Sequence, residues 1–195
     1  MLGPLSFERH SMVETSSGMA RLGSPTPPFL LPDTCGKHWS RETYEYHPAL
    51  LVAFICNHCP YVVHLADSLA ALAREFSKSG LGLVAINPND VDRYPDDSPE
   101  KMIEFAAEHG FDFPYLFDES QFVARAFKAT CTPDFFLYDE NHRLYYRGCF
   151  DDARPRNDIP VTGRCLREAI DALLSGRDAP SEQSPSVGCS IKWKT

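Results

Sequence analysis

The sequence lacks the features of a nucleic-acid-binding or membrane-spanning protein. Its 195 residues carry a formal net charge of −8, and the lysines and arginines form no basic cluster, so the usual electrostatic footprint for binding polyanions is missing. No run approaches the roughly 20 apolar residues that a membrane helix needs. The first thirty residues also lack a basic start followed by an apolar stretch. We therefore expect a cytoplasmic protein with no nucleic-acid partner and no membrane partner.

The cysteine content points to redox chemistry. Seven cysteines are spread over the chain, and an odd number argues against a fully paired secreted framework. This pattern favours reduced thiols with a reactive subset.

Buried strands alternate with helices along the middle of the chain. Unbroken apolar runs of strand length are typical of strands that are buried on both faces. The predicted strands cover residues 49–55, 81–86, 134–138 and 144–149, and the predicted helices cover residues 60–79 and 98–110, a short segment from residue 122 and a last segment from residue 162 to 176. This order predicts an α/β fold with a mixed central sheet flanked by helices on both faces.

The ends of the chain differ in composition from this middle. Residues 1–28 are rich in Ser, Gly and Pro and are expected to form a flexible N-terminal arm, followed by the domain over residues 29–176. Residues 177–195 form a polar C-terminal tail that is interrupted by the apolar residues 187–193. Burial of these apolar side chains predicts that this part of the tail docks on the domain.

Cys56 and Cys59 lie between a predicted buried strand and a predicted helix. A proline is best tolerated at the first helical position, which makes Pro60 that position and Cys59 the N-cap. Backbone amides and the helix dipole stabilise an anion there, so the pKa of the Cys59 thiol is lowered. Cys59 is therefore the predicted nucleophile and Cys56 its partner, and His58 adds positive charge beside the thiolate when protonated.

A zinc site and a purely structural role are the alternatives for this cysteine pair. Zinc ribbons need a second ligand pair at matching spacing, and the sequence has none; the histidines available to the pair are His38, His58 and His64. The polar residues Asn57 and His58 are poor choices for a core. We expect no metal and no cofactor.

The cysteine pair after a buried strand, with Thr132-Pro133 before a later strand, resembles the thioredoxin superfamily. The resemblance implies that Pro133 is cis, lies against the active-site cysteines and exposes backbone to a partner; otherwise Pro133 is a turn proline. Counting from the strand phenylalanine Phe54 matches Cys59 to the first thioredoxin cysteine, so Cys56 is an extra upstream cysteine.

The sequence also resembles the AhpC/TSA, or peroxiredoxin-like, branch. Cys59-Pro60 matches the peroxidatic Cys-Pro, and residues 189–194 have the C-x-x-x-W-K spacing found around a resolving cysteine. Cys56 stands where that branch has a threonine and Val52 where it has a proline, and the arginine that steadies the peroxide is not found. Without these donors nothing polarises the O–O bond.

Two further cysteines are candidate redox thiols. Cys131 lies two residues before Pro133 and is either a third redox thiol or a small buried hydrophobe. Cys189 exchanges with the pair if the tail docks on its face, and is a packing residue if the tail docks elsewhere. Packing is slightly favoured, because Cys56 is the nearer partner in sequence.

The sequence thus predicts a thiol–disulfide oxidoreductase in which Cys59 attacks and Cys56 resolves. Its expected partners are protein or small-molecule disulfides and a cellular thiol reductant. The first alternative is an antioxidant thiol peroxidase that consumes peroxide, with Cys56 or Cys189 resolving. The second is a redox sensor or adaptor that changes its binding to another protein without turnover.

Overall fold

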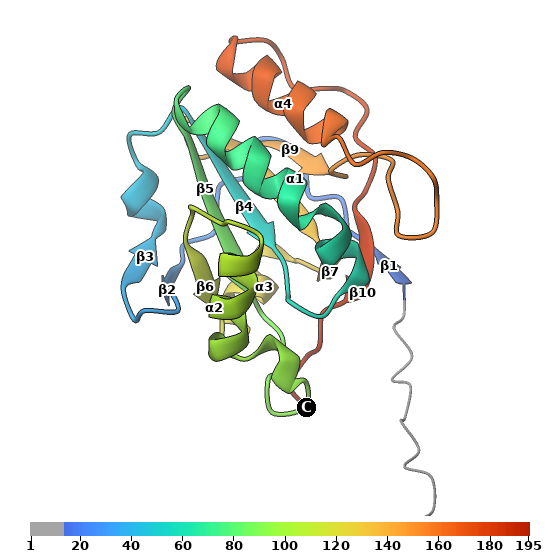
Figure 1. Cartoon of the computed structure of the whole chain (residues 1–195). Helices are drawn as coiled ribbons and strands as arrows, with labels where there is room; N and C mark the ends of the chain where they lie inside the picture. Colours follow the sequence, from blue (N-terminus) through green and yellow to red (C-terminus); the bar gives the residue numbers. More distant parts are fainter. Residues whose placement is uncertain (1–13) are drawn as a thin grey trace, which may run out of the picture.

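The computed structural model describes residues 14–195, and its centre is a five-stranded mixed sheet (Figure 1). The sheet has the order β6-β5-β4-β8-β9, in which β4, β5 and β6 are parallel and β8 and β9 are antiparallel to their neighbours. Its strands are β4 (Ala49–Phe54), β5 (Leu81–Asn87), β6 (Tyr115–Phe117), β8 (Asp134–Asp139) and β9 (Leu144–Gly148). Two short strands, β2 (Leu30–Pro32) and β3 (His38–Ser40), form a separate hairpin.

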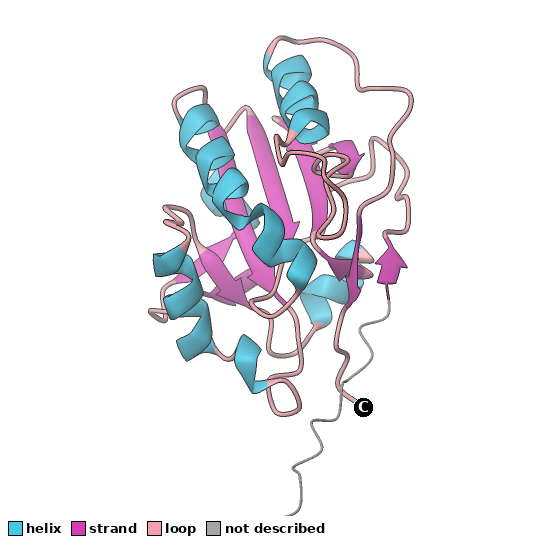
Figure 2. Ribbon diagram, turned by 45° about the vertical axis from the view of Figure 1, so that its right-hand side comes forward, coloured by secondary structure: helices cyan, strands magenta, loops and turns pink. Residues whose placement is uncertain are grey.

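The helices cover both faces of this sheet (Figure 2). They are α1 (Pro60–Ser77), α2 (Pro99–Glu108), α3 (Phe122–Phe127) and α4 (Arg164–Leu174), with the 3-10 turns η1 (Arg41–Tyr44) and η2 (Pro95–Asp97). Alternate residues of β4 explain the layering, since Leu51 packs with α1 and α4 on one face whereas Val52 packs with α3 on the other. A strand that is buried on both faces carries apolar side chains on both faces, which gives a continuous apolar run in the sequence. The α/β prediction is confirmed, and the architecture is a thioredoxin fold.

A small second sheet joins the two ends of the chain. It has the order β1-β10-β7, with β1 (Glu14–Ser16), β10 (Val187–Ser190) and β7 (Cys131–Thr132). The predicted docking of the tail is confirmed, because β10 pairs with β7 and Ile191 is buried.

The expected flexible arm differs from the structure beyond the first residues. From Glu14 onward the chain is held to the body, first by β1 pairing with β10 and then by backbone hydrogen bonds at Thr26. These pairings satisfy backbone groups that a loose arm would leave to water. The other part of the predicted arm, residues 1–13, lies outside the described residues.

The polar segment of residues 87–97 is buried at residues 87–90 and at Asp97, and more exposed between them. Asn87, Asn89, Asp90 and Asp97 are all buried. The side chains of Asn87 and Asn89 donate to the carbonyl and the carboxylate of Asp97, and Asn89 and Asp90 are hydrogen-bonded to the backbone of Lys192 in the tail. The loop therefore forms one wall of the cysteine site. None of the helices within residues 14–195 is long and apolar enough to cross a membrane.

Candidate active site

Cys59 caps the first long helix. It precedes Pro60, the first residue of α1, and its extended backbone (φ −73°, ψ 119°) is that of an N-cap residue, which confirms the predicted register. The backbone amides of Val62 and Val63 point back to the Cys59 carbonyl. The side chain of Cys59 is fully buried, so its sulfur is shielded from bulk water.

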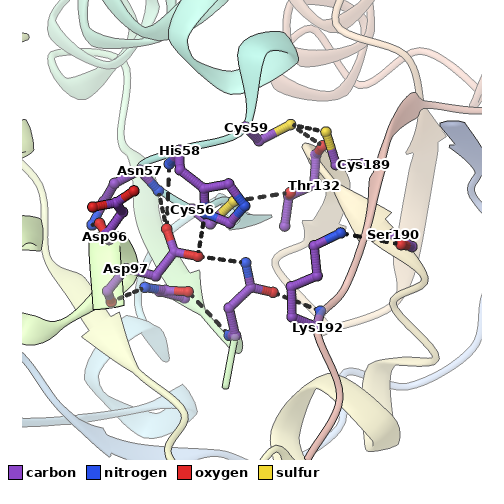
Figure 3. Close-up of polar contacts among 12 residues, drawn as sticks. Cys56, Asn57, His58, Cys59, Asp96, Asp97, Thr132, Cys189, Ser190 and Lys192 are labelled. Carbon is purple, nitrogen blue, oxygen red and sulfur yellow. Dashed lines mark hydrogen bonds and ion pairs between the residues drawn. The ribbon is translucent and has the colours of Figure 1, made fainter. Parts of the chain in front are cut away.

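Three cysteines, Cys56, Cys59 and Cys189, meet Thr132 at this N-cap (Figure 3). The Sγ atom of Cys59 lies 2.9 Å from the Sγ atom of Cys189 and 3.1 Å from the carbonyl oxygen of Thr132. The Sγ atom of Cys56 lies 3.2 Å from the hydroxyl oxygen of Thr132. A disulfide has an S–S distance of about 2.05 Å, so Cys59 and Cys189 need only a small approach to form one.

This arrangement corrects the expectation that Cys189 packs elsewhere. Strand β10 pairs with β7 in a register that sets Cys189 opposite Thr132, and Thr132 already contacts Cys59. Cys189 therefore reaches the cysteine pair. The sulfur of Cys56 interacts with the Thr132 hydroxyl as well as with Cys59.

The three thiols differ in acidity. Burial raises the pKa of Cys59, but hydrogen bonds from the thiols of Cys189 and Cys56 and from backbone amides outweigh burial and hold this pKa far below its ordinary value. Burial and the interaction with Cys59 raise the pKa of Cys56. The interaction with Cys59, followed by burial, raises the pKa of Cys189. The negative charge of the cluster consequently resides on Cys59.

His58 faces a buried carboxylate. Its Nδ1 atom lies 2.7 Å from Oδ2 of Asp97, and its ring stacks on Tyr94. Burial lowers the pKa of His58, but the hydrogen bond and the charge of Asp97 outweigh burial and raise it. A protonated His58 is thus paired with the Asp97 carboxylate. This carboxylate compensates the positive charge that His58 was expected to place beside the Cys59 thiolate.

Asp97 organises the loop that carries the cysteines. Its Oδ1 atom accepts hydrogen bonds from the backbone amides of Asn57 and His58, and its Oδ2 atom accepts one from the side chain of Asn89. Asn89 in turn accepts a hydrogen bond from the backbone amide of Lys192, two residues beyond β10. The network ties the Cys56–Cys59 loop to the tail that bears Cys189.

Sequence reasoning missed Asp97 and the contact role of Thr132. Asp97 lies in a polar loop, and no pattern marks one of its acidic residues as fully buried. The Thr132-Pro133 dipeptide was recognised, and its peptide bond is cis, as the resemblance implies. Thr132, the residue before Pro133, touches Cys59.

Cys131 lies beside this cluster without a sulfur contact among the described residues. It is fully buried, its sulfur lies 3.5 Å from the carbonyl oxygen of Pro133, and burial raises its pKa. These features fit the small buried hydrophobe of the two alternatives.

A buried arginine, Arg147, lies on the other face of the sheet. Arg147 of β9 pairs with Asp134 at 2.9 Å and stacks on Phe136. Phe136 belongs to the cluster with α3, whereas Cys59 belongs to the cluster with α1. Arg147 therefore cannot polarise a peroxide at Cys59.

A metal would have to compete with existing contacts. Cys56, His58 and Asp97 offer ligand atoms that lie within 4.8 Å of one another, which suits zinc in ligand type. Asp97 is already bound to two backbone amides, Asn89 and His58, and Cys56 is bound to Thr132. The expected absence of a metal stays a prediction.

A pocket of about 490 Å³ opens beside the sulfur cluster, and Cys189 is the cysteine that lines it. Its other walls come from the start of α1, from β1 and from the loop of residues 154–157. The site thus combines an acidic buried thiol with a second buried cysteine that lines a pocket.

Comparison with known proteins gives a family match. The model of the AhpC/TSA family matches residues 22–147. A Mycobacterium tuberculosis protein named as a candidate peroxiredoxin is 28% identical over 107 residues, which are 55% of this chain and 63% of that protein. The match thus spans less than two thirds of that relative.

Solved structures extend the likeness to nearly the whole chain. A structure from Geobacillus kaustophilus described as an uncharacterized conserved protein is 49% identical, with a TM-score of 0.92 over 94% of this chain and 98% of that one. A hypothetical protein from Sinorhizobium meliloti is 48% identical, with a TM-score of 0.91 over 93% and 99%.

More distant structures share the fold alone. They are the peroxidoxin BcpB of Mycobacterium tuberculosis, at 19% identity with a TM-score of 0.62 over 82% of this chain and all of that one, and a thiol:disulfide interchange protein of Chlorobium tepidum, at 17% with a TM-score of 0.61 over 80% and 99%.

Proposed function

Because the chain belongs to the AhpC/TSA family, we propose that it is a thiol–disulfide oxidoreductase whose redox couple is Cys59 and Cys189. The contact of 2.9 Å between their sulfurs, at the N-cap of α1, carries this proposal. Cys59 has the lowered pKa of a nucleophile and of a good leaving group. Cys56 supports the couple by hydrogen bonding to the Cys59 thiolate, in place of the resolving role predicted from the sequence.

The proposed oxidation transfers two electrons to a partner disulfide. The Cys59 thiolate attacks one sulfur of the partner, and the other partner sulfur leaves as a thiolate. Cys189 then attacks the Cys59 sulfur of the mixed disulfide, closes the Cys59–Cys189 bond and passes its proton to the second departing partner thiolate. The protein disulfide and two partner thiols are the products, and no cofactor takes part.

Peroxide is the second candidate oxidant, favoured by the burial of Cys59. A small molecule reaches a fully buried sulfur more easily than a protein disulfide does, and a protein named as a candidate peroxiredoxin is among the relatives. The Thr132 carbonyl lies 3.1 Å from the Cys59 sulfur and cannot donate to a peroxide oxygen. We therefore rank small-molecule disulfides ahead of peroxide, and place the reaction in the cytoplasm.

The test maps the disulfide that forms first. The reduced protein is treated with one equivalent of oxidised glutathione or of hydrogen peroxide, and its disulfides are identified by non-reducing peptide mass spectrometry. We expect a dominant Cys59–Cys189 link, which Cys59→Ser abolishes and which Cys35→Ser, at an exposed cysteine, leaves unchanged. A dominant Cys56–Cys59 link would return the resolving role to Cys56.

Turnover separates the enzyme alternatives. Catalytic reduction of the small disulfide with slow peroxide consumption supports the first ranking, whereas fast peroxide consumption reverses it. Reversible oxidation without turnover of either substrate would leave a redox sensor.

A further inference from the structure

We propose that the pocket beside Cys189 is the entry site for a small thiol that carries carboxylates, and that this thiol reduces the protein by attacking Cys189. The inference rests on the proposed Cys59–Cys189 couple and adds the class of reductant and the sulfur at which it reacts.

The pocket gives access to one sulfur of the couple. Among its lining residues are Glu14, Tyr61, Arg154, Arg156, Val187 and Cys189, and its volume is about 490 Å³. Cys59 does not line this pocket, and its side chain is fully buried. Cys189 lines the pocket, although only 2% of its surface is exposed, so a thiol that arrives here reaches Cys189 before Cys59. The volume lies within the range of roughly 300–1,000 Å³ that is typical of small-molecule sites.

The charges of the pocket favour an acidic ligand. Arg154 and Arg156 outnumber the single carboxylate of Glu14, whose oxygen is hydrogen-bonded to Tyr61. Arg156 is exposed and makes no ion pair within the part of the chain that the structure describes. The chain as a whole carries a charge of −8. The two arginines that line the pocket together with Cys189 therefore form a local positive region on an acidic protein. Arginines bind carboxylates in bidentate geometry.

The loop that carries the arginines is held in place before any ligand arrives. The side chain of Asp151 accepts hydrogen bonds from the backbone amides of Ala153, Thr162 and Gly163. Arg154 donates from Nη1 to the carbonyls of Asp151 and Ala153. A preorganised loop loses less conformational freedom when a ligand binds.

The chemistry of the couple selects the same sulfur. When the thiolate of the reductant attacks Cys189, the Cys59–Cys189 bond breaks and Cys59 leaves with the electron pair as a thiolate. Cys59 is the better leaving group, because the Cys56 thiol and the backbone amides of Val62 and Cys189 still stabilise its thiolate while Cys189 is held in the mixed disulfide, and a thiol of lower pKa leaves faster. A second molecule of the reductant then attacks the reductant sulfur of the mixed disulfide. Cys189 is released, and the two reductant molecules leave as their disulfide.

The test compares thiols of different charge. The oxidised protein, with its Cys59–Cys189 link verified by peptide mapping, is reduced by mercaptosuccinate, glutathione, 2-mercaptoethanol and cysteamine. Each rate constant is expressed per thiolate and divided by that of the same thiol with a small reference disulfide. We expect mercaptosuccinate and glutathione to exceed 2-mercaptoethanol by about tenfold, as local fields at charged sites produce, and cysteamine to be slowest.

Two arginine variants locate the effect. Arg156→Gln should remove most of the advantage of the acidic thiols, whereas Arg21→Gln, at an exposed arginine that does not line the pocket, should retain it. Equal normalised rates for all four thiols, or an advantage of the acidic thiols that Arg156→Gln leaves intact, would overturn the inference about the reductant. The proposed Cys59–Cys189 redox couple would be unaffected by either result. Absence of the Cys59–Cys189 link in the oxidised protein would instead overturn the proposed function, and this inference with it.

Discussion

Cys59 depends on neighbouring thiols for its acidity, and this dependence can be measured. We predict that Cys189→Ala raises the pKa of Cys59, because it removes a hydrogen-bond donor to the thiolate. A hydrogen bond to a charged group contributes about 1.5–3 kcal/mol, which corresponds to an increase of about 1–2 pKa units. The measurement is a pH titration of the ultraviolet absorbance of the thiolate in the reduced protein.

The control for this titration is Cys35→Ala, at an exposed cysteine outside the cluster. Cys59→Ala should remove the acidic titration altogether. If Cys189→Ala titrates like the unmodified protein, Cys189 does not stabilise the Cys59 thiolate. The lowered pKa of Cys59 would then no longer support Cys189 as its redox partner.

The ion pair between His58 and Asp97 should make stability depend on pH. The pKa of His58 is raised in the folded protein, so its contribution is fully present below the unfolded pKa of about 6.5 and is lost as the pH rises through the folded value. We predict that His58→Gln lowers the free energy of unfolding by about 1 kcal/mol at pH 6, because the pair is partly exposed, and by less at pH 9.

Urea unfolding of the oxidised forms at both pH values checks this prediction, since oxidation removes the Cys59 thiolate from the comparison. His38→Gln, at an exposed histidine of β3, is the control. A deficit of the same size at pH 6 and pH 9 would show that His58 acts through packing alone.

Strand β10 delivers Cys189 to Cys59, and Gly188 controls how closely it approaches. A Cβ atom at Gly188 would lie 2.1 Å from the carbonyl oxygen of Thr132, which is backbone and cannot rotate away. We predict that Gly188→Ala pushes β10 off β7, lowers the free energy of unfolding by about 1–3 kcal/mol and slows formation of the Cys59–Cys189 link severalfold. Urea unfolding and timed peptide mapping measure the two effects.

Gly18→Ala is the matched control, because a Cβ atom there meets nothing within 4 Å. A Gly188→Ala variant that forms the link at the normal rate would mean that β10 does not set the position of Cys189.

The elements that the sequence predicts are those with a long apolar signal. Strand β4 and helix α1 carry such signals, and Pro60 fixes the start of the helix and thereby the N-cap position of Cys59. The strands β1, β7 and β10 contain two to four residues each, too few to show a period. Their pairing joins segments far apart in the chain, which no local pattern records.

The residues of the site could likewise be predicted where a local motif marks them, and not where they meet through long-range pairing. Cys56, Cys59 and Pro133 stand out by local motif, and all lie at the site or beside it. The proximity of Cys189 to Cys59 depends on the register of β10 against β7. The carboxylate of Asp97 is reached only when the loop of residues 87–97 folds against the cysteine loop.

At the scale of the whole molecule, the proposed disulfide closes a large loop. Cys59 and Cys189 are 130 residues apart in the chain, and cross-linking such a loop removes unfolded-state entropy worth about 5 kcal/mol in the chain-entropy model, compared with about 2 kcal/mol for a link across a few residues. The alternative Cys56–Cys59 link spans three residues. The two disulfides should therefore differ in thermal stability.

We predict that oxidised Cys56→Ser, which retains Cys59 and Cys189, melts near the oxidised unmodified protein, whereas oxidised Cys189→Ser melts lower. The difference of about 3 kcal/mol between the two links corresponds to about 6–12 °C for a chain of this size. Differential scanning calorimetry measures this difference in melting temperature. In the oxidised forms Cys59 is not a thiolate, so the free energy of that thiolate does not enter the comparison. The melting temperatures of the reduced variants give the loss of stability that each serine substitution causes without a disulfide. If, after that correction, oxidised Cys189→Ser melts with the unmodified protein and oxidised Cys56→Ser melts lower, the working disulfide is the short one and Cys189 is a packing residue of the docked tail.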